Sequence, residues 1–354
     1  MINDINFNYF IIFFFISLIY SYLLVRISKN IFSGKLLDND FLKPQAFHSK
    51  PTARIGGILI ISLFIFFIFF FYKSIFFLDY LIFSTTLFML GFLDDLKIKI
   101  TPNKRLLGMI FILIILIEIF SIEIYRSGLS FLNLWLENKI FQTSFVLLCF
   151  LFIINGSNMI DGFNGQLGIH FLIITIIYFI INLTNNYYSF SFFLLGQLVI
   201  IFLFLIFNFP NAKIFLGDSG SYLLGVFISI NTIKTYELNT FINPFFFSSI
   251  LFYIFFEVFF SFLRKSFKKN SPTQPDNFHL HMLLYKVIKM RTKYKNINYL
   301  VAIIINIFYI FLILPLYFFR ENPLFCRYYF FILLTVYLCS YYKLYYKTKS
   351  NENI

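Results

Sequence analysis

Residues 190–208 read FSFFLLGQLVIIFLFLIFN, a run without a charged side chain. The hydrocarbon core of a bilayer is about 30 Å thick, and a helix of roughly 20 apolar residues crosses it. This run therefore predicts a membrane-spanning helix. Comparable runs recur along the whole chain, in which 60% of the 354 residues are hydrophobic and 13% are charged. Such a composition excludes a soluble domain with an ordinary polar surface.

The apolar runs predict an all-α, polytopic integral membrane protein that forms a single transmembrane domain over residues 1–354. We expect about eleven transmembrane helices, near residues 7–27, 55–73, 75–94, 105–121, 140–160, 166–183, 190–208, 219–236, 243–263, 297–319 and 327–346. The first run lacks a preceding basic region and a cleavage site, so we interpret it as a retained span. The segment 122–139 mixes apolar and polar residues and is expected to form an interfacial helix on the outer side. The three cysteines lie in apolar runs and predict neither a disulfide framework nor a metal site.

The distribution of Lys and Arg predicts the orientation. If the N-terminus lies outside, 23 of the 29 Lys and Arg residues fall on the cytoplasmic side, as the positive-inside rule requires. This arrangement accounts for the net charge of +13 without a nucleic-acid partner. We predict a multi-pass protein of the cell inner membrane. The cytoplasmic loops that carry its polar segments are expected at 28–54, 94–105, 155–166, 208–220 and 264–296.

Polar segments that interrupt the apolar pattern all fall on this cytoplasmic side. The first reads HSKPTARIGG over residues 48–57, and its Lys50 and Arg54 beside a glycine pair suit a phosphate cradle. An ordinary basic loop with glycines for helix packing is the alternative. The second contains Asp94 and Asp95, two adjacent carboxylates at the end of a span. Their mutual repulsion predicts a divalent cation or a proton-transfer role, unless the pair is solvated and neutralised by nearby lysines.

The third segment reads NGSNMIDGFNG over residues 155–165. Asn155, Asn158 and Asp161 follow one another at i, i+3 and i+6, so on a continuous helix they would share roughly one face. A polar turn between two spans explains the glycines of this segment but not the spacing of these side chains. We therefore expect the segment to contribute to a binding site.

The fourth segment includes Asn208, Phe215 and Asp218. Asp218 precedes the small residues that open the next span, so it can cap that helix or bind Mg²⁺. The fifth segment carries His279 and His281 in the basic loop before the tenth span. A histidine pair without a third ligand is weak support for a metal site, and phosphate contact or an inert surface are the other interpretations.

Taken together, these segments resemble the polyprenyl-phosphate N-acetylhexosamine-1-phosphate transferase family, from Asp40 to about Tyr285 and in the family's order. The resemblance implies a helical membrane enzyme with a cytoplasmic active-site cleft. Such an enzyme transfers N-acetylhexosamine 1-phosphate from a UDP-sugar to undecaprenyl phosphate and releases UMP. This reaction initiates the synthesis of cell-surface polysaccharides. The implied cofactor is Mg²⁺, with Mn²⁺ as a substitute. The implied partners are the UDP-N-acetylhexosamine, the polyprenyl phosphate, membrane lipid and, as a possibility of the family, a second copy of the chain.

The resemblance also assigns residues. It implies catalytic roles for Asp94, Asp95, His279 and His281. It implies metal binding by Asp218, together with Asp95. It implies substrate binding by Lys50, Arg54, Asn158, Asp161, Asn164, Asn208 and Phe215, with Phe215 stacking on uracil. The four aspartates among these residues are expected to converge at the inner leaflet boundary.

Two departures from the family pattern bear on the donor. Asn164 stands where many members repeat an aspartate, which favours base recognition over metal binding at this position. The motif around His279 and His281 lacks the additional histidine of many members. The missing histidine, together with the first-loop sequence KPTAR over residues 50–54, favours the N-acetylglucosaminyl branch over the alternative, a phospho-N-acetylmuramoyl-pentapeptide transferase. A transporter or flippase is the alternative from another class, and Glu257 within a span has no assigned role.

Overall fold

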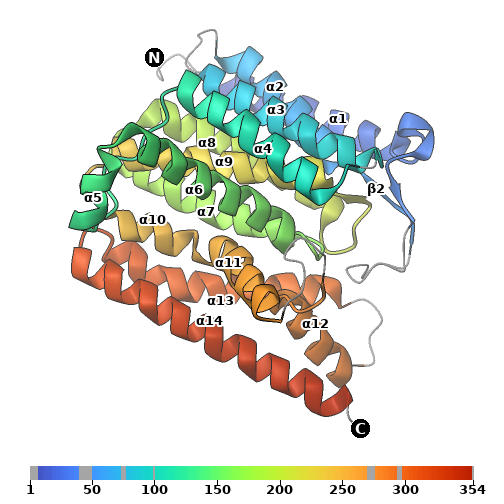
Figure 1. Ribbon diagram of the computed structural model, residues 1–354. Helices are drawn as coiled ribbons and strands as arrows, with labels where there is room; N and C mark the ends of the chain where they lie inside the picture. Colours follow the sequence, from blue (N-terminus) through green and yellow to red (C-terminus); the bar gives the residue numbers. More distant parts are fainter. Residues whose placement is uncertain are drawn as a thin grey trace.

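The computed structural model describes residues 7–39, 50–72, 77–98, 100–268, 276–292 and 297–352. It is almost entirely helical (Figure 1), which confirms the predicted all-α fold. The helices are α1 (Phe7–Ile27), α2 (Gly56–Phe71), α3 (Leu78–Asp95), α4 (Pro102–Ile119), α5 (Ser130–Leu136), α6 (Lys139–Ile160), α7 (Gln166–Thr184), α8 (Tyr188–Asn208), α9 (Gly217–Leu238), α10 (Pro244–Ile250), α11 (Phe252–Phe267), α12 (Leu280–Arg291), α13 (Asn298–Phe318) and α14 (Pro323–Glu352). A short 3-10 helix, η1, covers Ile31–Gly34.

Each predicted span coincides with a helix, or in one case with the pair α10 and α11, which are bent by 69°. In the part of the chain that the structure describes, six helices are long and apolar enough to cross a membrane, and the bent pair is a possible seventh. Helix α2 is apolar but shorter, and α3, α4 and α9 carry charged side chains near their ends. The chain is therefore a multi-pass membrane protein, while the count of eleven spans remains a prediction.

Helix α9 forms the centre of the bundle. Nearly all its side chains are buried, and it packs against α2, α3, α6 and α7. Small residues permit this close packing, as they commonly do between membrane helices. At Gly225, for example, an added Cβ would lie 2.7 Å from the Cα of Ile154 in α6. The sequence thus places the first turn of α9 in contact with several neighbouring helices at once.

A small three-stranded sheet was not expected from the sequence. Strand β2 (Thr52–Arg54) pairs antiparallel with β1 (Leu37–Asp38) and parallel with β3 (Ile214–Phe215). In this register Arg54 lies directly opposite Phe215. The sheet therefore brings together two residues that were assigned to substrate binding but lie far apart in the chain.

The expected interfacial helix is shorter than predicted. Helix α5 covers Ser130–Leu136, and residues 122–129 before it are not helical. Gly128 has a φ of +82° there, and Ser127 donates its backbone N–H to the side chain of Asn133, 2.8 Å away. A turn held by these groups replaces the first half of the predicted helix.

The bundle has two distinct ends (Figure 1). Helix α5 lies at one end, whereas β2, α12 and the end of α14 lie at the other. Parts of three predicted cytoplasmic loops, residues 40–49, 99, 269–275 and 293–296, lie outside the described residues. The remaining parts of four polar segments gather around the first turn of α9, and the fifth, with His279 and His281, lies beside the loop after α6. Their contacts define the candidate site.

Candidate active site

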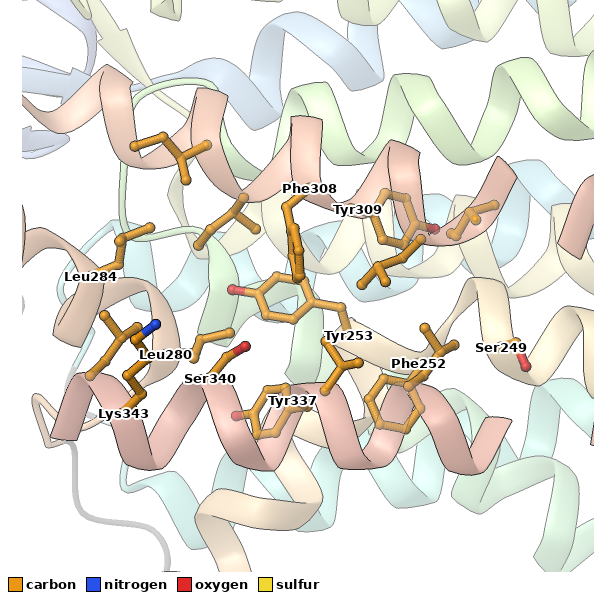
Figure 2. Close-up of a pocket in the computed structure, with 17 residues that line it drawn as sticks. Ser249, Phe252, Tyr253, Leu280, Leu284, Phe308, Tyr309, Tyr337, Ser340 and Lys343 are labelled. Atoms are coloured by element: carbon orange, nitrogen blue, oxygen red, sulfur yellow. The ribbon is translucent and has the colours of Figure 1, made fainter. Parts of the chain in front are cut away.

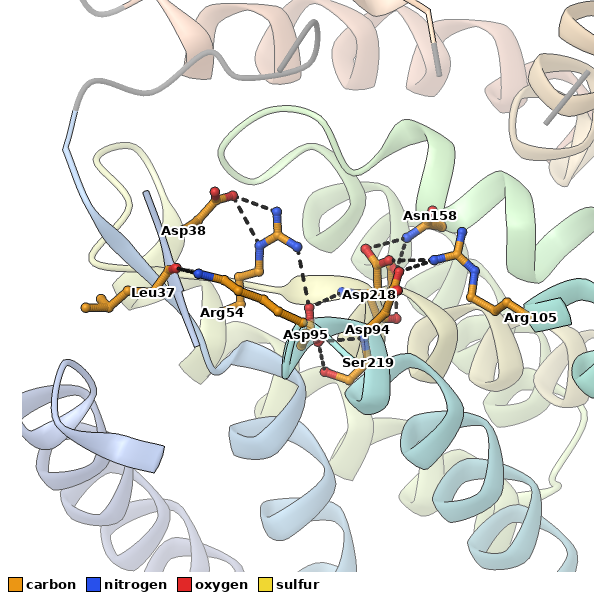
Figure 3. A network of polar contacts seen from close by, with 11 residues as sticks. Leu37, Asp38, Arg54, Asp94, Asp95, Arg105, Asn158, Asp218 and Ser219 are labelled. Atoms are coloured by element: carbon orange, nitrogen blue, oxygen red, sulfur yellow. Dashed lines mark hydrogen bonds and ion pairs between the residues drawn. The ribbon is translucent and has the colours of Figure 1, made fainter. Parts of the chain in front are cut away.

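Asp95, at the end of α3, holds the first turn of α9 (Figure 3). Its side chain is fully buried, and its Oδ1 accepts the backbone N–H of Asp218 at 3.0 Å. Its Oδ2 accepts the backbone N–H of Ser219 at 2.9 Å and the hydroxyl of Ser219 at 2.6 Å. A carboxylate is favourable at a helix N-terminus because the first N–H groups lack partners within the helix. Asp95 therefore performs the capping that the sequence offered as one interpretation of Asp218.

Two glycines allow α3 and α9 to come this close. Gly217 has a φ of +78°, and an added Cβ there would lie 2.6 Å from Oδ2 of Asp95. At Gly91, one turn before Asp95, an added Cβ would lie 2.6 Å from the backbone oxygen of Asp218 and 2.7 Å from the Cα of Ser219. Both neighbours of Gly91 are backbone atoms, so they cannot move aside by a change of rotamer.

We expect Gly91→Ala to separate α3 from α9 and to lower the free energy of unfolding by about 2 kcal/mol, the usual range for overpacking. The same change should reduce activity, because it displaces the backbone of Asp218. Gly108→Ala in α4 is the matched control, since its added Cβ would meet nothing closer than 3.7 Å. Thermal unfolding of both variants in detergent is the measurement. Equal unfolding temperatures for the two variants would contradict the proposed close contact.

Asp94 and Asp218 share one cation, Arg105. The Nη1 atom of Arg105 bonds the carboxylate of Asp94 and lies 3.1 Å from Oδ2 of Asp218. Asn158 donates from Nδ2 to Oδ1 of Asp218 at 3.1 Å and to the hydroxyl of Ser221 at 2.9 Å. The side chains of Asp94, Asp218 and Arg105 are 22–27% exposed, so a ligand can reach them from the aqueous side.

Arg105 was not singled out in the sequence, although it follows the aspartate pair closely. Thr101 caps α4 by accepting the N–H of Lys104, and Pro102 occupies the first turn. These two residues are standard signals for a helix start. They place Arg105 in the first turn of α4, beside the end of α3. The cap signal could therefore have located Arg105, but not its two carboxylate partners.

Arg54 connects the small sheet to the aspartates. Its Nε and Nη2 donate to Oδ2 of Asp38, at 3.1 and 2.6 Å, and its Nη1 lies 3.7 Å from Oδ1 of Asp95. Asp38 in β1 was also missed in the sequence, because no local pattern marks it. Arg54 thus stands beside Phe215 on one side and the acidic cluster on the other.

The loop after α6 contains the other predicted nucleotide-binding residues. Asp161 follows the last turn of α6, and burial, with the negative charge of Asp218 as the next cause, raises its pKa to about 8. Asn164 donates to the backbone oxygen of Pro210 at 2.9 Å. Asn208 accepts the N–H of Gly165 at 2.7 Å and donates to the backbone oxygen of Ile214 at 2.9 Å. Both polar atoms of Asn208 therefore serve to hold this loop against β3.

The common face predicted for the third segment is formed only in part. Asn158 reaches Asp218, as described above. Asn155 instead donates to the backbone oxygen of Leu151 at 2.7 Å and contacts the sulfur of Met109 at 3.6 Å. An Asn side chain in a helix readily bonds the carbonyl four residues earlier, and this bond turns Asn155 away from the aspartates.

The two histidines are buried at the start of α12. His279 Nδ1 lies 3.0 Å from Oε1 of Glu257, and its Nε2 lies 3.4 Å from Oδ1 of Asp276. His281 Nδ1 lies 3.4 Å from the hydroxyl of Tyr253. These contacts give Glu257 the role that the sequence left open, because its carboxylate also accepts the backbone N–H of Leu280 at 3.1 Å.

The free side of His281 faces the loop after α6. Its Nε2 is buried without a hydrogen-bond partner in the described part of the chain. An added Cβ at Gly162 would lie 3.2 Å from this atom, so the imidazole is next to the residue that follows Asp161. Burial lowers the pKa of His281 to about 3, so its ring is neutral near pH 7. With Tyr253 as donor to Nδ1, Nε2 carries the proton and can donate it to a ligand.

Half of the predicted site residues come together in space, while their roles stay predictions. Asp94, Asp95 and Asp218 form one cluster, and Arg54 and Asn158 join it directly. Asp161 is close enough for Asp218 and Asp95 to raise its pKa. Among the predicted site residues, Lys50 is the one with an exposed side chain, just before β2, and Phe215 is half-buried in β3.

The oxygen-rich cluster fits a hard divalent cation that is shared with a substrate. Within the described residues, no group of three His, Cys, Asp or Glu side chains is close enough to hold a metal ion. Mg²⁺ in such sites typically uses one or two carboxylates together with substrate phosphates. Asp94 and Asp218, which share Arg105, supply such a pair. Asp95 fits less well, since both its oxygens already accept hydrogen bonds from α9.

The chain has relatives among known proteins. Residues 77–236 match glycosyl transferase family 4. An undecaprenyl-phosphate alpha-N-acetylglucosaminyl 1-phosphate transferase of Thermotoga maritima is 29% identical over 249 residues, which cover 68% of this chain and 70% of that protein. Phospho-N-acetylmuramoyl-pentapeptide-transferases of Dictyoglomus turgidum and Dictyoglomus thermophilum are 33% and 31% identical over segments that cover 54% of this chain and 62% of each relative. The segment that matches the family, residues 77–236, includes the acidic cluster from Asp94 to Asp218.

Proposed function

We propose that this chain, whose residues 77–236 match glycosyl transferase family 4, transfers N-acetylhexosamine 1-phosphate from a UDP-sugar to undecaprenyl phosphate and releases UMP. The single observation that carries the proposal is the polar cluster at one end of an apolar bundle. Asp94, Asp218, Arg54 and Arg105 meet there within reach of water. A donor from the aqueous phase and an acceptor anchored in lipid can both reach this position.

In the proposed reaction, a phosphate oxygen of the acceptor attacks the β-phosphorus of the UDP-sugar. A new P–O bond forms as the bond between the β-phosphorus and the bridging oxygen breaks, and the electron pair leaves with UMP. The reactants are both anions, so the main task of the protein is to offset charge and to orient them. Mg²⁺, held by Asp218 and Asp94, would supply further positive charge at the diphosphate when bound.

The residues of the chain divide these tasks. Arg54 and Arg105 supply fixed positive charge beside the carboxylates. The Nε2–H of His281 points toward the loop after Asp161 and donates a hydrogen bond to a phosphate oxygen. Asp94, partly exposed, orients the acceptor phosphate. We propose that Asp95 acts as a positioning residue, because its oxygens are occupied by the first turn of α9.

The nucleoside is proposed to lie between the small sheet and the loop after α6. Phe215, opposite Arg54 in the sheet, provides the aromatic surface for uracil. Asn164 and Asp161 contribute polar groups for the base and ribose, and Lys50 extends from the strand that carries Arg54. Asn158 and Asn208 hold Asp218 and the loop, respectively, in place.

We further propose an inner-membrane location with this end of the bundle facing the cytoplasm and the N-terminus outside. The excess of Lys and Arg in the same segments supports this orientation. The reaction would then initiate the assembly of a surface polysaccharide. A homodimer remains a prediction from the resemblance alone.

The function is tested by UMP release from the purified protein with undecaprenyl phosphate and a panel of UDP-sugars. We expect turnover with UDP-N-acetylglucosamine or a related UDP-N-acetylhexosamine, and loss of turnover on removal of divalent cations. The identity to muramoyl-pentapeptide transferases supports a second candidate donor, UDP-N-acetylmuramoyl-pentapeptide. Exclusive use of that donor would reassign the branch, and no UMP release with any donor would exclude the transferase.

A pH experiment tests the protonation state of His281. Because burial lowers its pKa to about 3, the unfolded chain binds a proton between roughly pH 6.5 and pH 3 that the folded chain does not. The folded protein therefore loses stability relative to the unfolded chain as the pH falls from about 6.5, the pKa of an unfolded histidine, toward about 3, the pKa of His281 in the folded protein. We expect His281→Gln to lose less thermal stability than the wild type between about pH 7 and about pH 5. Parallel losses in the two proteins would mean that the folded imidazole is not held neutral.

A further inference from the structure

An apolar cavity of about 340 Å³ lies outside the acidic cluster, between α13 and α14, and residues of α10, α11 and α12 complete its lining (Figure 2). Its size falls within the range of small-molecule sites in proteins. Tyr253 lies near its middle, Ser249 toward one end, and Lys343 with Leu280 and Leu284 toward the other. The lining is hydrophobic apart from a few hydroxyls and the Lys343 ammonium group.

The cavity is open toward the lipid that surrounds the bundle. Ile304 and Phe308 of α13 line it, yet their side chains are 44% and 49% exposed. On a membrane helix, such exposed apolar side chains face hydrocarbon. A hydrocarbon chain can therefore enter between α13 and α14 without passing through water.

The end of the cavity at Lys343 is basic. In the part of the chain that the structure describes, Lys343 has an exposed side chain and no carboxylate partner. Two further lysines belong to the same end of the bundle: Lys286 and Lys268 have Nζ atoms 5.0 and 5.4 Å from the ring centroid of Phe278, and Lys268 also approaches Tyr345 of α14. A long Lys side chain at the end of an apolar slot can keep its ammonium group at the headgroup level. Lysines on this side of the membrane attract anionic lipid.

We propose that this cavity binds one acyl chain of an acidic phospholipid from the adjacent leaflet, with the lipid phosphate at Lys343. The occupant is not the acceptor of the transfer reaction. Tyr253 lines the cavity wall, its hydroxyl contacts His281, and the other side of the His281 ring contacts Gly162 of the loop after α6. The ring of Tyr253 therefore lies on the opposite side of His281 from that loop, and the histidine separates the cavity wall from the loop that carries Asp161.

A lipid bound in this cavity would contact tyrosines that hold the two histidines of the candidate active site. The hydroxyl of Tyr253 bonds His281, and the hydroxyl of Tyr337, also in the wall, donates to Oε2 of Glu257 at 2.8 Å. The other oxygen of Glu257 holds His279. An acyl chain packed against both tyrosine rings favours the rotamers that keep the histidines in place. Activity should therefore rise with the acidic lipid content of the membrane.

Adjacent residues of α14 provide matched variants. Ser340 lines the cavity, and Ser340→Phe would fill it, whereas Cys339, one residue earlier, is exposed and does not line it. Likewise, Lys343→Gln removes the ammonium group at the cavity end, and Lys349→Gln removes one that does not line it. None of these four residues belongs to the proposed catalytic machinery, so the variants should keep the basal activity.

The experiment counts bound lipids by native mass spectrometry after incubation with vesicles of phosphatidylcholine, with or without phosphatidylglycerol. We expect one tightly bound phosphatidylglycerol in the wild type, in Cys339→Phe and in Lys349→Gln. Ser340→Phe should lose it, and Lys343→Gln should bind it about five-fold more weakly, as expected for one surface lysine. This readout does not depend on transferase activity, so it can fail or succeed separately from the proposed function.

Three results would overturn the proposal. The first is equal binding of phosphatidylglycerol and phosphatidylcholine, which would mean a non-selective crevice. The second is equal behaviour of Ser340→Phe and Cys339→Phe. The third is an increase in the KM for undecaprenyl phosphate in Ser340→Phe with unchanged phosphatidylglycerol binding, which would assign the cavity to the acceptor. Stimulation of UMP release by phosphatidylglycerol in the wild type, and its loss in Ser340→Phe, would support the link to the histidines.

Discussion

Asp218→Asn is expected to lower the rate of UMP release about 10³-fold, the upper range for removal of one charge-stabilising group from an active site. Asp218 receives hydrogen bonds from Arg105 and Asn158 and is the carboxylate best placed to share a cation with a diphosphate. Asparagine keeps the shape and one acceptor oxygen, so the change removes charge without opening a cavity. The measurement is the initial rate of UMP release with saturating donor and acceptor.

The fold of this variant should survive. Asp218 accepts hydrogen bonds from Arg105 and Asn158 on its two oxygens, and an amide can keep one of them. Because the side chain is 24% exposed, water can satisfy the other donor, so the loss of thermal stability should be small. Glu118→Gln is the control, because Glu118 pairs with Lys139 at 3.4 Å on an exposed part of the protein, away from the cluster. Turnover of Asp218→Asn close to that of Glu118→Gln would exclude Asp218 from the reacting centre.

The sequence predicted the spans because length and hydropathy are local properties. A run such as 190–208 has few alternatives to a membrane helix, and α8 covers the same residues. It also predicted that the polar segments share one side of the membrane, because Lys and Arg mark that side. The contacts between Asp95 and Ser219, and between Asn158 and Asp218, confirm that three of these segments meet.

Pairing within the site could not be predicted from local patterns. Asp38 and Arg105 look like ordinary loop and helix-start residues, and their roles arise only when distant segments come together. The strands of the small sheet are two or three residues long, too short for an alternating pattern to be visible. Glu257 likewise gained an interpretation only through its contacts with His279 and Tyr337.

The pair Asp94 and Asp95 shows most clearly what local sequence patterns cannot predict. Neighbouring residues on a helix point about 100° apart, so Asp94 and Asp95 cannot face the same ligand equally. Asp94 is 27% exposed beside Arg105, whereas Asp95 is fully buried against α9. The sequence treats the two as equivalent. The packing of α3 on α9 separates a residue that is open to substrate from one that anchors the site.

Asp95→Asn should therefore destabilise the protein far more than Asp218→Asn, because Asp95 is fully buried and Asp218 is 24% exposed. The carboxylate of Asp95 accepts two backbone N–H groups and one hydroxyl. An amide offers one oxygen and places an NH₂ group against a donor, which leaves a buried N–H unpaired. Loss of charged hydrogen bonds at this helix end is expected to cost about 3 kcal/mol. The free energy of unfolding in a mixed-detergent titration is the measurement, with UMP release recorded in parallel.

Asp94→Asn, one residue earlier, is the matched variant for this comparison. It should keep near wild-type stability, since its carboxylate is partly exposed, and lose activity through the acceptor phosphate. Asp95→Asn should lose both, because the first turn of α9 carries Asp218 and moves when its anchor is weakened. If Asp95→Asn were instead as stable as Asp94→Asn and equally inactive, the Asp95 carboxylate would have to act on the ligand itself. The positioning role drawn from its hydrogen bonds would then be wrong.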